Sequence, residues 1–109
     1  MAEKKIQLDS ETINQVRAYR RALKSAQIPI EKMIVFGSRA KGTAKSYSDI
    51  DVAVVSAKFG KNYFREGVRL MHLRKNLLLI EPHPFNPNDL NDRYFSLANE
   101  VRKYGIVVD

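Results

Sequence analysis

VFGSRAKGTAKSYSDIDVAVV, residues 35–55, is the stretch that decides the fold of this chain. An apolar run rich in strand-forming residues ends at Gly37, which predicts a buried strand followed by a sharp turn. A short helical turn, closed by Gly42 in the left-handed conformation, is expected next. A second apolar run starts with Asp49 and Asp51 and predicts a central strand that is covered on both faces. The stretch therefore predicts strand, turn and strand, with two carboxylates where the second strand begins.

The other elements follow from hydrophobic periodicity and from turn residues. Helices are expected over residues 8–28, 62–76 and 88–105, and strands over residues 32–36, 49–57, 77–81 and 106–108. The order helix, strand, turn, strand, helix, strand, helix predicts one α/β (α+β) domain, residues 1–109, with a small sheet.

Two details of this prediction concern the third strand and the helix before it. Proline cannot donate to a ladder, so the third strand is expected to end at the proline-rich segment 82–87. The helix over residues 62–76 is expected to turn three apolar residues at helical spacing toward the core, namely Phe64, Val68 and Met71.

Composition limits the partners and the chemistry. The 109 residues are 44% hydrophobic, with a formal net charge of +7 and no cysteine. The positive charge favours polyanionic partners such as nucleotides or nucleic acid, although no block of like charges or recognition motif marks a nucleic-acid-binding arm. The lack of cysteine excludes disulfides and thiolate metal sites.

Membrane insertion and secretion are not expected. No apolar stretch approaches the length of a membrane span. The first residues also lack the apolar core of a signal peptide. We therefore expect a cytoplasmic protein that does not enter a membrane.

Asp49 and Asp51 are the first candidate site residues. Side chains alternate along a strand, so both carboxylates point to one face, roughly 7 Å apart. Such a pair is stable when one carboxyl is protonated or when a cation lies between them. Oxygen ligands favour Mg²⁺ or Mn²⁺, and Mg²⁺ usually completes its shell with water and substrate phosphates. The structural alternative is a solvated turn at the start of a strand.

The Gly37-Ser38 pair offers a place for those phosphates. A glycine lets a phosphate approach the backbone closely, and N–H groups at the start of a helical turn point toward it. Arg39 and Lys41 are close in sequence and can neutralise a polyphosphate. Together with the two aspartates, these residues predict a nucleoside triphosphate held between a phosphate-binding turn and a metal-binding strand.

Glu81 is the candidate third carboxylate, because nucleotidyl transfer commonly uses two metals and a base for the attacking hydroxyl. It follows four apolar residues at the expected end of the third strand. The structural alternative is a glutamate at a strand end that turns toward solvent. His83, between two prolines, is a weaker candidate, and His72 is expected at a helix surface.

The stretch GSRAKGTAKSYSDIDVAVV resembles the signature of the DNA polymerase beta-like nucleotidyltransferase superfamily. Chain size and the segment IEPHPF look most like the minimal nucleotidyltransferases (MNT), and the resemblance spans roughly residues 30–85. It implies a small mixed β-sheet backed by helices. It also implies Mg²⁺-dependent transfer of a nucleoside monophosphate, with ATP as the expected donor, to a protein or nucleic-acid acceptor.

Residue roles can be carried over by position in this signature. Gly37 and Ser38 correspond to the residues that hold the triphosphate. Asp49 and Asp51 correspond to metal-binding catalytic carboxylates. Glu81 stands at the third metal-binding and catalytic position, where many members carry aspartate, and would help to activate the acceptor.

The resemblance also implies a partner. Minimal members are often paired with a helical HEPN subunit as a toxin–antitoxin system, in which the nucleotidyltransferase is the antitoxin. A second hypothesis, motivated by small size and the lack of an acceptor domain, is a non-catalytic module that clamps and masks a partner protein. A third, motivated by the net charge, is a basic nucleic-acid-binding domain whose affinity falls steeply with salt.

Overall fold

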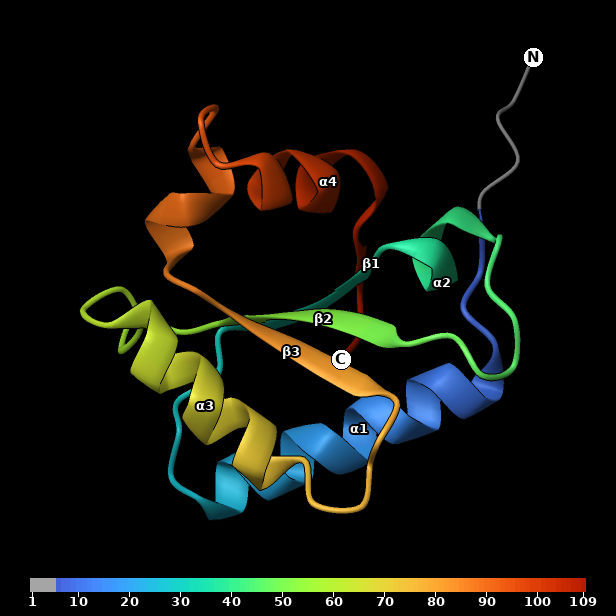
Figure 1. The fold of residues 1–109 in the computed structure, drawn as a ribbon, viewed down its shortest axis with the longest axis horizontal. Coiled ribbons are helices and arrows are strands. Elements are labelled where there is room, and N and C mark those ends of the chain that lie inside the picture. The colour runs from blue at the N-terminus through green and yellow to red at the C-terminus, as the bar shows by residue number, and fades with distance from the viewer. Residues whose placement is uncertain (1–5) are drawn as a thin grey trace.

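The computed structural model describes residues 6–109 (Figure 1). Its elements, in chain order, are α1 (Ser10–Ser25), β1 (Lys32–Phe36), α2 (Ser38–Lys41), β2 (Ile50–Val55), α3 (Tyr63–Leu73), β3 (Ile80–Phe85), the 3₁₀ helix η1 (Pro87–Asn91), α4 (Ser96–Tyr104) and β4 (Ile106–Val107). None of the helices in residues 6–109 has the length and apolar character needed to cross a membrane. The expectation that the chain carries no signal peptide rests partly on residues 1–5, which lie outside the described range.

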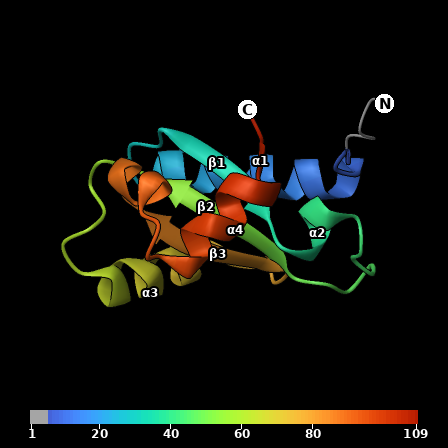
Figure 2. The same cartoon turned by 90° about the horizontal axis from the view of Figure 1, so that it is seen from above.

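A mixed four-stranded sheet, in the order β3-β2-β1-β4, forms the middle layer. β1 pairs antiparallel with β2 and β4, and β2 pairs parallel with β3. α1 and α3 cover one face of this sheet, and α4 covers the other (Figures 1 and 2). The structure confirms the predicted small mixed sheet backed by helices.

Strand alternation divides the core into two parts. In β2, Ile50 and Val52 pack toward α1 and α3, whereas Ala53 and Val55 pack toward α4. β2 is therefore buried on both faces, as predicted. Asp51 belongs to the row that faces α4, so its carboxylate lies on that side of the sheet.

α3 forms where a helix is predicted, but the predicted inward face is wrong. Phe64 is 84% exposed, and Val68 and Met71 are 42% and 38% exposed. Leu70 is fully buried in their place. The helix carries two apolar stripes. The stripe with Leu70 faces the core, because the leucines that follow it, such as Leu73, pack against the same core.

β3 begins later than predicted and runs through Pro82 and Pro84, so the predicted end at these prolines is wrong. The reason is that β3 is an edge strand. The carbonyls of Leu79 and Phe85 accept hydrogen bonds from N–H groups of β2 and of the residue after it, at 2.7 and 2.9 Å. The prolines occupy the alternate positions, where the missing N–H group faces away from β2.

The helix expected over residues 88–105 is divided into η1 and α4. Asp92, between them, accepts a hydrogen bond from the Tyr94 backbone N–H at 2.9 Å. This local turn competes with the helix. It leaves the Tyr94 side chain 98% exposed.

Tyr19 makes a buried hydrogen bond between α1 and α3, in which its hydroxyl donates to the Leu70 carbonyl at 2.8 Å. Burial raises the pKa of this phenol above its ordinary value of 10.0. The unfolded chain loses the proton near pH 10 while the folded chain keeps it, so stability that is present below pH 10 is lost as the pH rises further. We expect Tyr19→Phe to cost about 0.5–1.5 kcal/mol at pH 7.

The same variant should also flatten the fall in stability above pH 10. Urea unfolding of both proteins from pH 7 to pH 11 measures this difference. An equal alkaline loss of stability in wild type and Tyr19→Phe would contradict it.

Candidate active site

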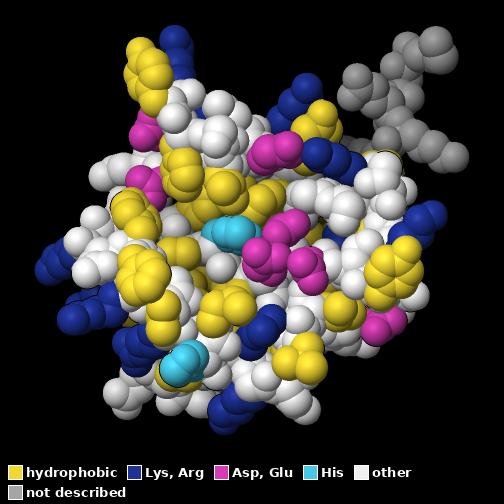
Figure 3. Space-filling view, viewed as in Figure 1, with side chains coloured by type: hydrophobic (Ala, Val, Ile, Leu, Met, Phe, Trp, Pro, Cys, Tyr) yellow, Lys and Arg dark blue, Asp and Glu magenta, His cyan; other side chains and the backbone are white. Residues whose placement is uncertain are grey.

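Parallel pairing of β2 and β3 brings the predicted carboxylates together. Asp51 is the register partner of Glu81, and Asp49 directly precedes β2. The side chains of Asp49 and Asp51 both lie close enough to Glu81 to raise the pKa of its carboxyl. Figure 3 shows acidic side chains gathered near the centre of this face, beside a histidine. We call Asp49, Asp51 and Glu81 the carboxylate cluster.

The electrostatics of this cluster favour a bound cation. Partial burial raises the pKa of Glu81, and hydrogen bonding to Asp49 and the charge of Asp51 raise it further. Each effect makes a third negative charge costly here. A divalent cation between the carboxylates would remove that cost, and the oxygen donors fit Mg²⁺ or Mn²⁺.

Gly37 places the start of α2 against the cluster. Its φ of 72° and ψ of −153° lie in a region that only glycine adopts readily. A Cβ atom at this position would collide with the Asp51 carboxylate. The Gly37 carbonyl accepts from the N–H groups of Ala40 and Lys41 at 3.1 and 3.0 Å. The first N–H groups of α2, which have no acceptor inside the helix, therefore start beside Asp51. We call Gly37-Ser38 the phosphate turn.

Arg39 is not placed to bind a polyphosphate as predicted. Its side chain is 5% exposed. The guanidinium donates to the carbonyls of Ser46 and Ser48 at 3.1 and 2.7 Å and to Thr12 Oγ1 at 3.3 Å. These bonds tie the loop before Asp49 to α1. Arg39 therefore holds this loop in position, and its guanidinium bonds to oxygen atoms of the protein itself.

Lys41 joins α2 to α4. Its Nζ donates to Glu100 Oε1 at 3.1 Å and lies 4.7 Å from the centre of the Tyr104 ring. A phosphate contact by Lys41 would have to compete with this ion pair. Its role toward a nucleotide stays a prediction.

His83 contacts the carboxylate cluster, although its sequence context makes it a weaker candidate. Its Nε2 lies 3.3 Å from Asp51 Oδ1, and its ring packs at 5.2 Å between centroids against Phe36. The flanking prolines predict the end of a strand, and this prediction hides the face that His83 shares with Glu81. Alternate prolines in an edge strand would have put Glu81 and His83 on one side of β3.

Two hollows are lined in part by His83, and one of them also includes a carboxylate of the cluster. One, of about 500 Å³, runs along α3 and β3 and includes Glu81 and His83. The other, of about 490 Å³, lies between β3, η1 and α4 and carries Tyr63, Tyr94 and Phe95 beside His83. Both are large enough for a small-molecule ligand.

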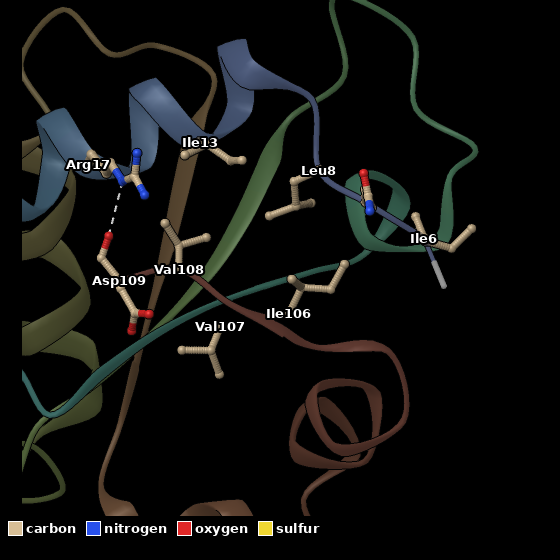
Figure 4. A pocket seen from close by; sticks show the side chains of 9 residues that line it. Ile6, Leu8, Ile13, Arg17, Ile106, Val107, Val108 and Asp109 are labelled. Atoms are coloured by element: carbon tan, nitrogen blue, oxygen red, sulfur yellow. Dashed lines mark hydrogen bonds between the residues drawn. The ribbon is translucent and has the colours of Figure 1, made fainter. Parts of the chain in front are cut away.

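A further cavity, of about 350 Å³, lies at the opposite edge of the sheet, between α1 and β4 (Figure 4). Aliphatic side chains dominate its lining. The Arg17 side chain closes one end by donating to the Asp109 carbonyl at 3.1 Å. None of the cluster carboxylates lines it.

Solved structures share this fold. A Sulfolobus solfataricus protein classed as a nucleotidyltransferase has a TM-score of 0.68 at 17% identity, over 89% of this chain and 78% of its own. A toxin-antitoxin structure with AMP-PNP has a TM-score of 0.59 at 24% identity, over 87% and 70% of the two chains. A complex of the tri-AMPylated Shewanella oneidensis HEPN toxin with MNT antitoxin has a TM-score of 0.50 at 22% identity, over 85% and 70%. No curated protein sequence matches the chain.

The model of the nucleotidyltransferase domain family matches residues 16–104. The match runs from within α1 to the end of α4. It takes in both the phosphate turn and the carboxylate cluster. This chain therefore belongs to the nucleotidyltransferase domain family.

Proposed function

We propose that this chain, acting as one domain, transfers a nucleoside monophosphate from ATP to a protein or nucleic-acid acceptor with Mg²⁺ or Mn²⁺. The main support is the convergence of the carboxylate cluster on the phosphate turn. Family membership supports a transferase. One structural neighbour contains AMP-PNP and another an AMPylated toxin, which supports an adenine nucleotide.

In the proposed reaction an acceptor hydroxyl oxygen bonds to the α-phosphorus, and the bond from that phosphorus to the α,β-bridging oxygen breaks. Pyrophosphate leaves. N–H groups at the start of α2 would hold the phosphate oxygens, and the Glu81 carboxylate would accept the hydroxyl proton. A cation bound by the aspartates would stabilise the negative charge on the phosphate.

The two hollows beside the cluster suit the two substrates. The hollow next to η1 and α4 is lined by aromatic side chains that include Tyr63, Tyr94 and Phe95, and aromatic faces stack on bases. We assign the nucleoside to it. The hollow along α3 includes Glu81, so an acceptor placed there would meet the proposed base.

Labelled ATP tests this proposal. ATP carrying the label on either the α- or the γ-phosphate is incubated with the protein, Mg²⁺ or Mn²⁺, and two acceptors: total RNA and the protein encoded by the adjacent gene. Nucleotidyl transfer moves the α-label to an acceptor and leaves the γ-label in pyrophosphate. Transfer of the γ-label, or no transfer with folded protein and bound partner, would overturn the proposal.

We further propose a helical partner of the HEPN type, docked on the apolar stripe of α3 formed by Phe64, Val68 and Met71. The stripe is exposed and lines the same hollow as Glu81. A partner bound there would hold its acceptor group beside the cluster. Two structural neighbours are toxin–antitoxin complexes, which supports such a partner.

This stripe also favours the second candidate function, a module that clamps a partner without catalysis. The two candidates differ in one result: the clamp binds and masks its partner with no label transfer. A nucleic-acid-binding function gains less support, because Lys and Arg side chains are scattered over the face in Figure 3.

Phe64→Ala tests the docking stripe. We expect affinity for the adjacent-gene protein to fall about 30-fold or more, as at an aromatic hot spot worth roughly 2 kcal/mol. The melting temperature should stay unchanged, because Phe64 is 84% exposed. Leu78→Ala, at a leucine that is 69% exposed outside the stripe, is the matched control. Titration calorimetry that gives equal affinities for wild type and Phe64→Ala would remove the stripe from the interface.

A further inference from the structure

His83, Asp51 and Glu81 together form a mixed nitrogen and oxygen donor set. Each offers one ligand atom, and these atoms all lie within 4.8 Å of one another. The His83 Nε2 and the Asp51 Oδ1 are 3.3 Å apart. The set is thus not made of carboxylates alone.

The spacing would fit three ligands around one metal ion after a contraction of the site. With metal–ligand bonds of about 2.1 Å, two neighbouring ligands of an octahedral ion are about 3.0 Å apart and two opposite ligands about 4.2 Å. The 3.3 Å contact between His83 and Asp51 is close to the first value. The limit of 4.8 Å exceeds the second value by about 0.6 Å. A small contraction would bring all three atoms onto one ion.

The fold holds the imidazole in place before any metal binds. Pro82 and Pro84 flank His83 and restrict the backbone of β3 on both sides. The ring packs against Phe36, with 5.2 Å between ring centroids. Its register partner in β2 is Ala53, whose short side chain leaves room for the ring to reach Asp51.

We propose that His83 Nε2 is a direct metal ligand, together with Asp51 and Glu81, and that this nitrogen makes the site select Mn²⁺ over Mg²⁺. Mg²⁺ prefers oxygen ligands and an all-oxygen shell, whereas imidazole suits first-row transition metals. The inference rests on the proposed function, because it assigns the metal of the same site. It differs from an all-carboxylate site in both ligand and metal.

Mn²⁺ alone is the probe for this inference. Pulsed electron paramagnetic resonance of Mn²⁺ bound to the intact chain should show coupling to the ¹⁴N nucleus of an imidazole. The coupling should persist in His72→Gln, a control at the exposed histidine of α3, and disappear in His83→Gln. Mn²⁺ affinity should fall about 10–100-fold in His83→Gln, with Mg²⁺ affinity changed less than threefold.

Several results would overturn the proposal that His83 is a ligand of a site selective for Mn²⁺. These are Mn²⁺ bound without nitrogen coupling, coupling that survives His83→Gln, or wild type that binds Mg²⁺ as tightly as Mn²⁺. His83→Asn is the second variant if His83→Gln does not fold, as judged by circular dichroism. The spectra need no turnover, so failure of the proposed function would appear separately, as absent label transfer with the nitrogen coupling intact.

Discussion

The variant Asp49→Asn/Asp51→Asn is expected to lose nucleotide transfer while keeping its fold. Asparagine has the shape of aspartate but not its charge, so the site can no longer hold a divalent cation against the α-phosphate. We expect the transfer rate to fall at least about 10³-fold, which corresponds to roughly 4 kcal/mol of transition-state stabilisation. Transfer of α-labelled phosphate to the acceptor, at saturating ATP and metal, measures the loss.

Stability distinguishes this result from simple unfolding. Both aspartates raise the pKa of Glu81 through a hydrogen bond and through charge, so the three carboxyls oppose one another in the metal-free protein. Removal of two charges should leave the metal-free melting temperature equal or higher, and should abolish its rise on addition of Mn²⁺ or Mg²⁺. Glu31→Gln, at an exposed carboxylate beside the far end of β2, is the control and should retain full transfer. Unchanged transfer by the double variant would end the catalytic proposal.

Gly37→Ala is expected to damage both stability and transfer. The backbone of Gly37 lies where a residue with a Cβ is strained by about 1–3 kcal/mol. The new Cβ would also meet the Asp51 carboxylate, so that either the turn or the metal ligand must move. We expect the melting temperature to fall by roughly 5–15 °C. Transfer should fall by more than the unfolded fraction explains.

Gly67→Ala is the matched control, because the same substitution should act in the opposite direction there. Gly67 lies within α3, and a Cβ would meet only the Pro84 Cδ at an ordinary 3.9 Å. Alanine in a helix interior is favoured over glycine by roughly 0.5–1 kcal/mol, so stability should rise. Thermal unfolding by circular dichroism and the label-transfer assay, run on both variants, test the pair. A Gly37→Ala protein that is as stable and active as wild type would contradict our account of the turn.

The strand–turn–strand unit could be predicted from sequence because its signals are local and agree with one another. β1 ends at the residue before Gly37, and Gly42 closes α2 in the left-handed conformation, both as predicted. The common face of Asp49 and Asp51 follows from strand alternation, whereas Glu81 is a candidate because nucleotidyl transfer commonly needs a third carboxylate. These predictions needed no knowledge of which strand lies at the sheet edge.

The errors arose where tertiary context decides. Pro82 and Pro84 are compatible with β3 only because no strand within residues 6–109 pairs with its outer side, and the pattern of the segment alone does not reveal that position. Misplacing β3 hid the proximity of His83 to Asp51. For α3, two apolar stripes compete, and packing selects the one that carries Leu70. The inward turn of Arg39 depends on Ser46 and Ser48, which are brought to it by the fold of the loop.

The prolines of β3 have a consequence for recognition. A partner that adds a strand to a sheet needs alternating donors and acceptors along the exposed edge. At Pro82 and Pro84 that edge presents carbonyls without N–H groups, so the carbonyls of an added strand would have no hydrogen-bond donor there. Strand addition is thereby disfavoured next to the carboxylates, and homotypic stacking into fibres with it. Under the proposed function, an acceptor protein would instead have to reach the site through side chains, or place a helix across this edge and offer its own hydrogen-bond donors.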